Sequence, residues 1–241
     1  MSIEGKTLLV TGANRGIGQA LVTEALARGA KQVYCGTRKP LDHSDERVTP
    51  VTLDITDPAQ IQGAASQIES LDILINNAGI MLPDVPFDPS VLDRHMAVNF
   101  HGTNAVTQAF LPALVNSGGA VITMMSVVAL APLPPFPSYS ISKAASYSLT
   151  KTLRAFYGPR GVKFHAVLAG PIDTDMVREL QVPKATPQSA AQAIFDAVAK
   201  GEEDIFPDAT VAPLAELYAN SPDKILEQQF AALVQEAPAS S

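Results

Sequence analysis

"TGANRGIG", residues 11–18, follows the apolar run "KTLLV" and carries glycines at positions 12, 16 and 18. A glycine-rich turn between a strand and a helix lets the backbone adopt positive φ, and it lets a phosphate approach the free N–H groups of the helix N-terminus. The spacing here is G-x-x-x-G-x-G, whereas the common dinucleotide fingerprint is G-x-G-x-x-G. The stretch predicts a nucleotide-binding turn, and an ordinary strand–helix turn is the competing interpretation.

On either side of this turn, short apolar runs alternate with longer helical windows. The apolar runs are nearly continuous, which is typical of parallel strands covered on both faces. We expect strands at Thr7–Thr11, Gln32–Gly36, Val48–Leu53, Asp72–Asn76, Ala120–Met125 and Val162–Leu168, and helices at Gly16–Arg28, Pro58–Ile68, Ser90–Val115, Ser138–Tyr157 and Pro187–Lys200. This alternation predicts an α/β fold, a Rossmann-type doubly wound parallel sheet flanked by helices.

Length, charge and cysteine content narrow the possible classes. A chain of 241 residues fits one domain, residues 1–241, with a flexible tail from about residue 236. A net charge of −7 without a basic cluster argues against binding to nucleic acid or to an anionic membrane. We expect a cytoplasmic protein, because the first residues resemble neither a signal peptide nor a membrane span and the single Cys35 permits no intrachain disulfide. No metal is expected, because metal-ligand spacing is missing among His43, His95, His101 and His165.

The end of the second expected strand, "VYCGTR" (33–38), indicates which nucleotide would bind. A cofactor with free ribose hydroxyls usually meets a carboxylate about 20 residues beyond the glycine turn. Thr37 and Arg38 stand there instead, and a guanidinium pairs well with a 2′-phosphate. Arg15, inside the turn, could reach the same phosphate. Together the two arginines favour NADP(H) over NAD.

Tyr139 and Lys143 lie four residues apart in "PSYSISKAA" (137–145), so they share one face of the expected helix. A lysine ammonium beside a phenol stabilises the phenolate and lowers the pKa of the tyrosine toward the working range. Tyr139 could then give or take a proton at a carbonyl or alcohol oxygen. Ser126, at the end of the strand "GAVITMMS", could hydrogen-bond the same oxygen.

The motifs "TGANRGIG", "NNAG" (76–79), Asn99 in "AVNFHG", Ser126 and "YSISK" resemble, in order and interval, those of the classical short-chain dehydrogenase/reductase (SDR) family. The resemblance runs from residue 5 to about residue 200, and the altered glycine spacing is that family's own version. It implies an NADP-dependent oxidoreductase acting on CH–OH and C=O groups, as a carbonyl reductase or alcohol dehydrogenase. It also implies a homodimer or homotetramer, because members commonly pair the helices expected around 100–115 and 140–157.

The resemblance assigns roles to single residues. Tyr139 would be the general acid in reduction and the base in oxidation, and Lys143 would lower its pKa and hold the nicotinamide ribose. Ser126 would orient the substrate carbonyl, and Asn99 would hold a water that relays protons from Lys143 to solvent. The implied cofactor contacts are Gly12, Asn14, Arg15, Gly16, Ile17, Gly18, Thr37, Arg38, Asp54, Ile55, Asn77, Ala78, Gly79, Tyr139, Lys143, Gly170, Pro171, Ile172 and Thr174. Where the family usually has Pro-Gly, this chain has Ala169-Gly170, which we expect to adjust nicotinamide placement without abolishing activity.

The expected substrate pocket is apolar. Its residues are Ser126, Val127, Val128, Leu133, Phe136, Tyr139 and Met176, with Met81 as a further candidate. Residues 172–190 would form a short lid, mobile from Asp175 to Thr186. Such a pocket predicts a small or medium apolar ketone or aldehyde. Because Arg15 and Arg38 favour NADPH, the usual reductant in cells, net carbonyl reduction is the preferred direction.

Two other functions fit parts of the pattern. A non-catalytic NADP-binding sensor would use the same fold to regulate a partner, but it would not need Asn99, Ser126, Tyr139 and Lys143 together. An epimerase or dehydratase would recycle a tightly held NAD. Its relatives carry a longer C-terminal domain than the roughly 40 residues that follow the last expected helix here.

Overall fold

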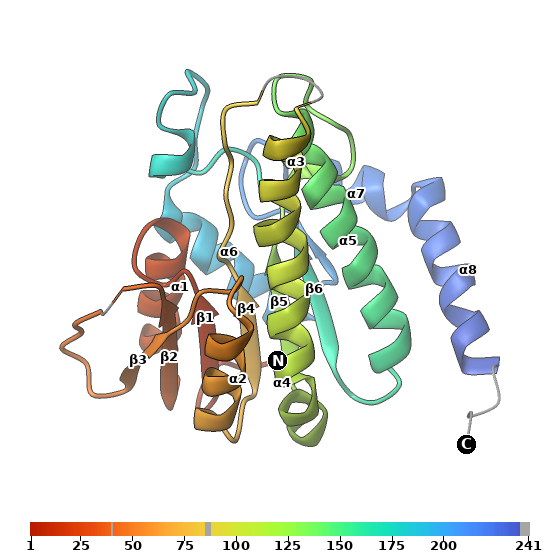
Figure 1. Ribbon diagram of the computed structural model, residues 1–241. Helices are drawn as coiled ribbons and strands as arrows, with labels where there is room; N and C mark the ends of the chain where they lie inside the picture. The colour runs from red at the N-terminus through yellow and green to blue at the C-terminus, as the bar shows by residue number, and fades with distance from the viewer. Residues whose placement is uncertain (40, 85–87, 237–241) are drawn as a thin grey trace.

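The computed structural model describes residues 1–39, 41–84 and 88–236. Within them, seven parallel strands form one sheet in the order β3-β2-β1-β4-β5-β6-β7 (Figure 1). The strands are β1 Thr7–Thr11, β2 Gln32–Thr37, β3 Val48–Thr52, β4 Ile73–Asn76, β5 Ala120–Met124, β6 Lys163–Val167 and β7 Asp204–Ile205. The strand order reverses between β1 and β4. In open α/β sheets, ligands bind at the carboxyl ends of the strands beside such a reversal.

Helices cover both faces of the sheet, which confirms the predicted Rossmann-type fold (Figure 1). α1 and α6 pack together on one face, and α2, α4 and α5 cover the other. The helices are α1 Gly16–Ala27, α2 Pro58–Gln67, α3 Pro89–His95, α4 Thr103–Ser117, α5 Pro137–Tyr157, α6 Pro187–Lys200, α7 Leu214–Ala219 and α8 Pro222–Glu236. No helix in this part of the chain is long and apolar enough to cross a membrane.

The helix starts follow ordinary capping chemistry. Asp57 accepts hydrogen bonds from the N–H groups of Ala59 and Gln60 at the start of α2, where Pro58 takes the first helical position. Thr186 caps α6 in the same way, through the N–H of Ser189. Side-chain capping and proline placement therefore fix where these helices begin.

The expected helix Ser90–Val115 is in fact three pieces. α3 runs into a π-helical segment, Met96–Gly102, and α4 follows it. π-Helical turns are rare and occur frequently at functional sites, and this one carries Asn99. Three further elements lie beyond the predicted ones: β7, α7 and α8. The expected tail falls almost entirely on residues 237–241, outside the described residues.

α8 lies beside α5, and charged side chains join the two helices (Figure 1). Arg154 of α5 contacts Asp204 of β7 at 3.1 Å and also contacts Glu227 of α8. Lys224 of α8 lies 2.7 Å from Asp204 and 3.2 Å from Glu227. Burial alone raises the pKa of Asp204, but attraction to Arg154 and the hydrogen bond from Lys224 outweigh it and leave the pKa below its usual value. This charge network joins β7, α5 and α8.

Candidate active site

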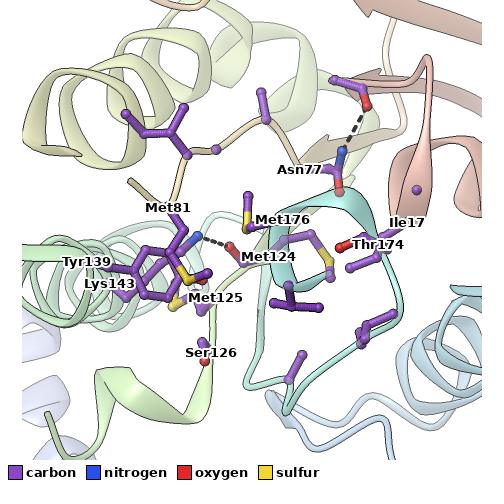
Figure 2. Close-up of a pocket in the computed structure, with 18 of the residues that line it drawn as sticks. Ile17, Asn77, Met81, Met124, Met125, Ser126, Tyr139, Lys143, Thr174 and Met176 are labelled. Atoms are coloured by element: carbon purple, nitrogen blue, oxygen red, sulfur yellow. Dashed lines mark hydrogen bonds between the residues drawn. The ribbon is translucent and has the colours of Figure 1, made fainter. Parts of the chain in front are cut away.

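A large cavity of about 1580 Å³ opens at the carboxyl ends of the strands. It exceeds the roughly 300–1,000 Å³ of a typical small-molecule site, so it has room for more than one ligand. All of the cofactor and substrate-pocket residues predicted from the sequence line it. Among the predicted catalytic residues, Ser126, Tyr139 and Lys143 also line the cavity, whereas Asn99 is buried and does not. Figure 2 shows Tyr139 and Lys143 on one side of the cavity and Ile17, Asn77 and Thr174 on the other.

The glycine turn forms one end of the cavity. Gly12 and Gly16 have φ values of 67° and 54°, in the left-handed region that favours glycine. A Cβ at Gly18 would overlap the carbonyl oxygen of Gly12 and would lie 2.6 Å from Asn77 Nδ2. That Asn77 amide donates to the carbonyl oxygens of Thr11 and Gly12, at 2.9 and 3.1 Å. The loop after β4 therefore fixes the turn in place.

The two predicted phosphate-binding arginines differ in their surroundings. Arg15 pairs with Asp175 of the lid at 2.9 Å, and Arg178 contacts the same carboxylate. Arg38 has no ion-pair partner within residues 1–39, 41–84 and 88–236. Arg38 is therefore the guanidinium that can meet a phosphate without first leaving a carboxylate. No sequence pattern predicts the pairing of Arg15 with Asp175, because the two residues lie 160 positions apart.

Nearby, Asp54 follows β3 and is held in a local turn. Its Oδ1 accepts hydrogen bonds from the Thr56 N–H at 2.9 Å and the Thr56 hydroxyl at 2.7 Å. These bonds lower the pKa of Asp54, so the side chain is a fixed carboxylate in the cavity wall.

Tyr139, Lys143 and Ser126 meet at the other end of the cavity. α5 places Lys143 Nζ 5.6 Å from the centre of the Tyr139 ring, and this ammonium donates a hydrogen bond to the carbonyl oxygen of Met124 at 2.8 Å (Figure 2). Ser126 precedes a short 3₁₀ turn, Val127–Ala129, that begins the apolar wall. The arrangement puts a phenol, an ammonium and a hydroxyl around one space.

The predicted fall in the pKa of Tyr139 is not seen. Burial raises the pKa of Tyr139 to about 12, and a hydrogen bond with Ser126 acts in the opposite direction. Burial also lowers the pKa of Lys143 to about 8. The physical reason is that loss of water disfavours both charged forms, while the lysine ammonium is directed at Met124.

Asn99 fastens two segments of the site together. Its Oδ1 accepts from the N–H of Ile80 at 2.8 Å, and its Nδ2 donates to the Ile80 carbonyl oxygen and to Ser142 Oγ, both at 2.9 Å. A Cβ at Gly79 would lie 3.2 Å from Asn99 Oδ1 and 3.7 Å from Lys143 Nζ, so these three residues converge. The side chain thus positions the loop after β4 against α5, and its water-relay role stays a prediction.

His95 and Asp84 support α5, and sequence reasoning missed both. His95 is fully buried, and its ring stands edge-on to that of Tyr139, with centroids 6.2 Å apart. The Leu82 N–H donates to His95 Nε2 at 3.1 Å, so the proton sits on Nδ1 and is donated to the Val91 carbonyl oxygen at 2.8 Å. Asp84 Oδ2 accepts from the N–H of Ser138, in the first turn of α5, at 2.6 Å. Spacing alone shows none of these contacts.

The segment after β6 is held by a hydrogen bond to a residue that follows β7. Asp208 Oδ2 accepts a hydrogen bond from the N–H of Gly170 at 2.8 Å, next to the Ala169 that departs from the usual Pro-Gly. Ile172 and Ala185 form a parallel bridge that closes the base of the lid. Residues 187–190, expected in the lid, form the first turn of α6. The open part of the lid carries Met176 into the cavity wall.

Comparison with known proteins places the chain among oxidoreductases. Residues 6–185 match the family model described as short chain dehydrogenase. Oxidoreductase UcpA of Salmonella typhimurium is 33% identical over 199 residues, which cover 74% of this chain and 73% of that protein. The 3-oxoacyl-acyl-carrier-protein reductase FabG of the same organism is 33% identical over 224 residues, covering 83% and 90%. A short chain dehydrogenase from Burkholderia cenocepacia, whose crystal structure contains NADP, is 38% identical in sequence. The two structures superpose with a TM-score of 0.86, over 99% of this chain and 100% of that chain.

Proposed function

Because the chain belongs to the short-chain dehydrogenase/reductase family, we propose that it is an NADPH-dependent reductase, reversible as a dehydrogenase, acting on the carbonyl group of a small to medium apolar substrate. One observation carries the proposal: a single cavity joins the glycine turn and Arg38 at one end to Ser126, Tyr139 and Lys143 at the other. The NADP bound in the Burkholderia cenocepacia relative supports the choice of cofactor.

The residues at the glycine turn fit a dinucleotide. A Cβ at Gly18 would overlap the Gly12 carbonyl oxygen, so the turn is tightly packed and needs glycine at this position. No side chain within the described residues caps the start of α1, so its first N–H groups remain available to an anion. Arg38 and Arg15 would hold a 2′-phosphate, while Ile172 and Thr174 would hold the nicotinamide end. When bound, such a cofactor supplies the hydride that reduces the carbonyl carbon.

The proton chemistry falls to Tyr139. A pKa of about 12 keeps the phenol protonated at neutral pH, as a general acid requires, so its hydroxyl can pass a proton to the carbonyl oxygen. The Ser126 hydroxyl can hydrogen-bond the same oxygen and hold it in line. Lys143, with a pKa of about 8, is mostly an ammonium at neutral pH and stabilises the phenolate left behind. In oxidation the same phenolate takes the proton back.

The test combines cofactor binding with turnover. Purified protein is titrated with NADPH and NADH by cofactor fluorescence, and NADPH oxidation is then followed with apolar ketones and aldehydes. We expect Tyr139→Phe to abolish turnover and to keep NADPH binding, while Tyr157→Phe, the same change at the end of α5 and outside the cavity, keeps both. Wild-type protein that binds NADPH but reduces no carbonyl would favour the non-catalytic sensor instead.

A homodimer or homotetramer in the cytoplasm is part of the same proposal. Ile141 and Phe156 on α5 are exposed, at 49% and 54%, although α8 lies along another side of this helix. Such apolar exposure supports a subunit contact there. The single buried Cys35 supports a reducing compartment. Light scattering on the purified protein measures the oligomeric state directly.

A further inference from the structure

α7 presents an apolar face to the catalytic cavity. Leu214, Leu217 and Tyr218 have the spacing i, i+3 and i+4, so they lie on one side of the helix, and all three line the cavity. Leu217 is 71% exposed and Leu214 is 39% exposed. Neither leucine belongs to an apolar core cluster of the described residues. The two side chains therefore face the cavity instead of packing into the protein.

Tyr218 anchors α7, which leaves the two leucines without an anchoring role. The Tyr147 hydroxyl donates to Tyr218 Oη at 2.6 Å, and the Tyr218 hydroxyl donates to Asp223 at 2.6 Å. The Tyr218 ring packs against the rings of Phe206 and Tyr147, with centroids 6.0 and 6.3 Å apart. A fixed helix with unpacked leucines suits a binding wall, because little must be ordered when a ligand arrives.

Other exposed apolar side chains line the same cavity. Leu133 after β5 and Met176 of the lid are each 42% exposed. We call Leu133, Met176, Leu214 and Leu217 the apolar arm. Large apolar side chains that are exposed in one cavity usually mark a binding surface, because their exposure to water is unfavourable.

Charge is distributed unevenly around the cavity. Its charged lining residues come from the turn after β1, the loops after β2 and β3, the lid and α5. None of the charged lining residues comes from residues 127–136 or from α7. Around Leu133, Leu214 and Leu217 these two segments offer no guanidinium or ammonium to meet a carboxylate or phosphate, so that part of the arm favours an uncharged group.

We propose that the apolar arm receives an extended, uncharged hydrocarbon or aryl substituent of the carbonyl substrate, and that Leu217 of α7 determines specificity for its length. This inference rests on the proposed function, since the carbonyl end of the substrate is placed at Ser126 and Tyr139. It adds the class of substrate: a medium-sized ketone or aldehyde with an extended apolar tail.

The test is a series of 2-alkanones from 2-butanone to 2-decanone, each assayed for kcat/KM with NADPH. Each methylene that enters the arm should raise kcat/KM by about fourfold until the arm is full. In Leu217→Asn, the ratio of kcat/KM for 2-decanone to that for 2-butanone should fall by about tenfold or more. The matched control Leu226→Asn changes an exposed leucine of α8 outside the cavity and should keep the wild-type ratio.

A second measurement separates this inference from the proposed function. Calorimetry with NADPH present, which blocks oxidation, gives the Kd of 2-decanol and 2-butanol. We expect 2-decanol to bind more tightly in the wild type and Leu217→Asn to lose this advantage. If no ketone is reduced but this binding pattern holds, the proposed function fails and the apolar arm stands. The inference would be overturned if kcat/KM and Kd do not change with chain length. It would also be overturned if Leu217→Asn keeps the wild-type ratio of kcat/KM for 2-decanone to that for 2-butanone.

Discussion

Arg38 should contribute more to NADPH binding than Arg15 does. A hydrogen bond to a charged group contributes about 1.5–3 kcal/mol, or roughly 10- to 150-fold in Kd. Arg38 can form such a hydrogen bond without breaking an ion pair with any of the described residues. Arg15 must first leave Asp175, and since these side chains are 68% and 48% exposed, their pair stabilises by only about 0.2–1 kcal/mol. The advantage of Arg38 is therefore up to about fivefold in Kd.

The assay is the Kd of NADPH and of NADH for three variants. We expect Arg38→Ser to weaken NADPH binding by roughly 10- to 150-fold and to leave NADH nearly unchanged, because only NADPH carries the 2′-phosphate. Arg15→Ser should weaken NADPH binding less than Arg38→Ser does. Asp175→Asn releases Arg15 from its pair and should tighten NADPH by up to about fivefold.

Two results would refute this reasoning. If Arg38→Ser weakens the binding of NADPH and NADH equally, the guanidinium does not bind the 2′-phosphate. If Arg15→Ser costs as much as Arg38→Ser, the pair with Asp175 does not limit Arg15. All titrations need one ionic strength, because salt screens exposed charges.

Three further changes test the fold and the site. Asp204→Asn leaves buried cations without their shared carboxylate and should cost about 3 kcal/mol, or roughly 6–12 °C in Tm. Because the folded-state pKa of Asp204 is lowered, its stabilisation is present above about pH 4 and is lost as the pH falls, so the Tm difference should narrow in acid and a constant difference would contradict the assignment. Gly18→Ala should weaken NADPH at least about tenfold with an unchanged circular dichroism spectrum, because its methyl would overlap the Gly12 carbonyl; normal binding would mean that the turn can move. His95→Phe keeps the bulk but loses both hydrogen bonds, and should lower kcat about tenfold while the Kd of NADPH stays constant, with exposed His101→Phe as the control; an unchanged kcat would exclude a positioning role.

Much of the fold follows from local pattern. Most of the first six strands are nearly continuous apolar runs, and the structure confirms all six to within a residue or two at each end. The glycine turn and the Tyr139–Lys143 spacing likewise depend only on neighbours in sequence. These features could be predicted because strand burial, helix capping and i, i+4 geometry act over short stretches.

What the sequence could not reveal depends on contacts between distant residues. The pair of Arg15 with Asp175 and the cap of α5 by Asp84 join separate loops. The fall in the pKa of Tyr139 was predicted from its neighbour Lys143, yet burial within the fold decides the direction. The π-helical turn at Asn99 differs from an α-helix by too little for periodicity to detect.

α8 differs most from what its sequence pattern predicts, because a charged residue is buried and apolar residues are exposed. Lys224 is only 8% exposed, whereas Ile225 and Phe230 are 47% and 61% exposed. Apolar periodicity would predict that the helix packs on its apolar side. In the first turns of α8 the buried side instead carries Lys224 and Glu227, which join the network with Arg154 and Asp204.

This reversal has an evolutionary consequence. A buried charge within a network is costly to replace alone, since its loss leaves the remaining charges unbalanced. Arg154, Asp204, Lys224 and Glu227 should therefore covary as a group among relatives that keep α8. Ile225 and Phe230, which face outward, should drift among residues of many kinds. Along this helix the charged positions, rather than the apolar ones, would record common descent.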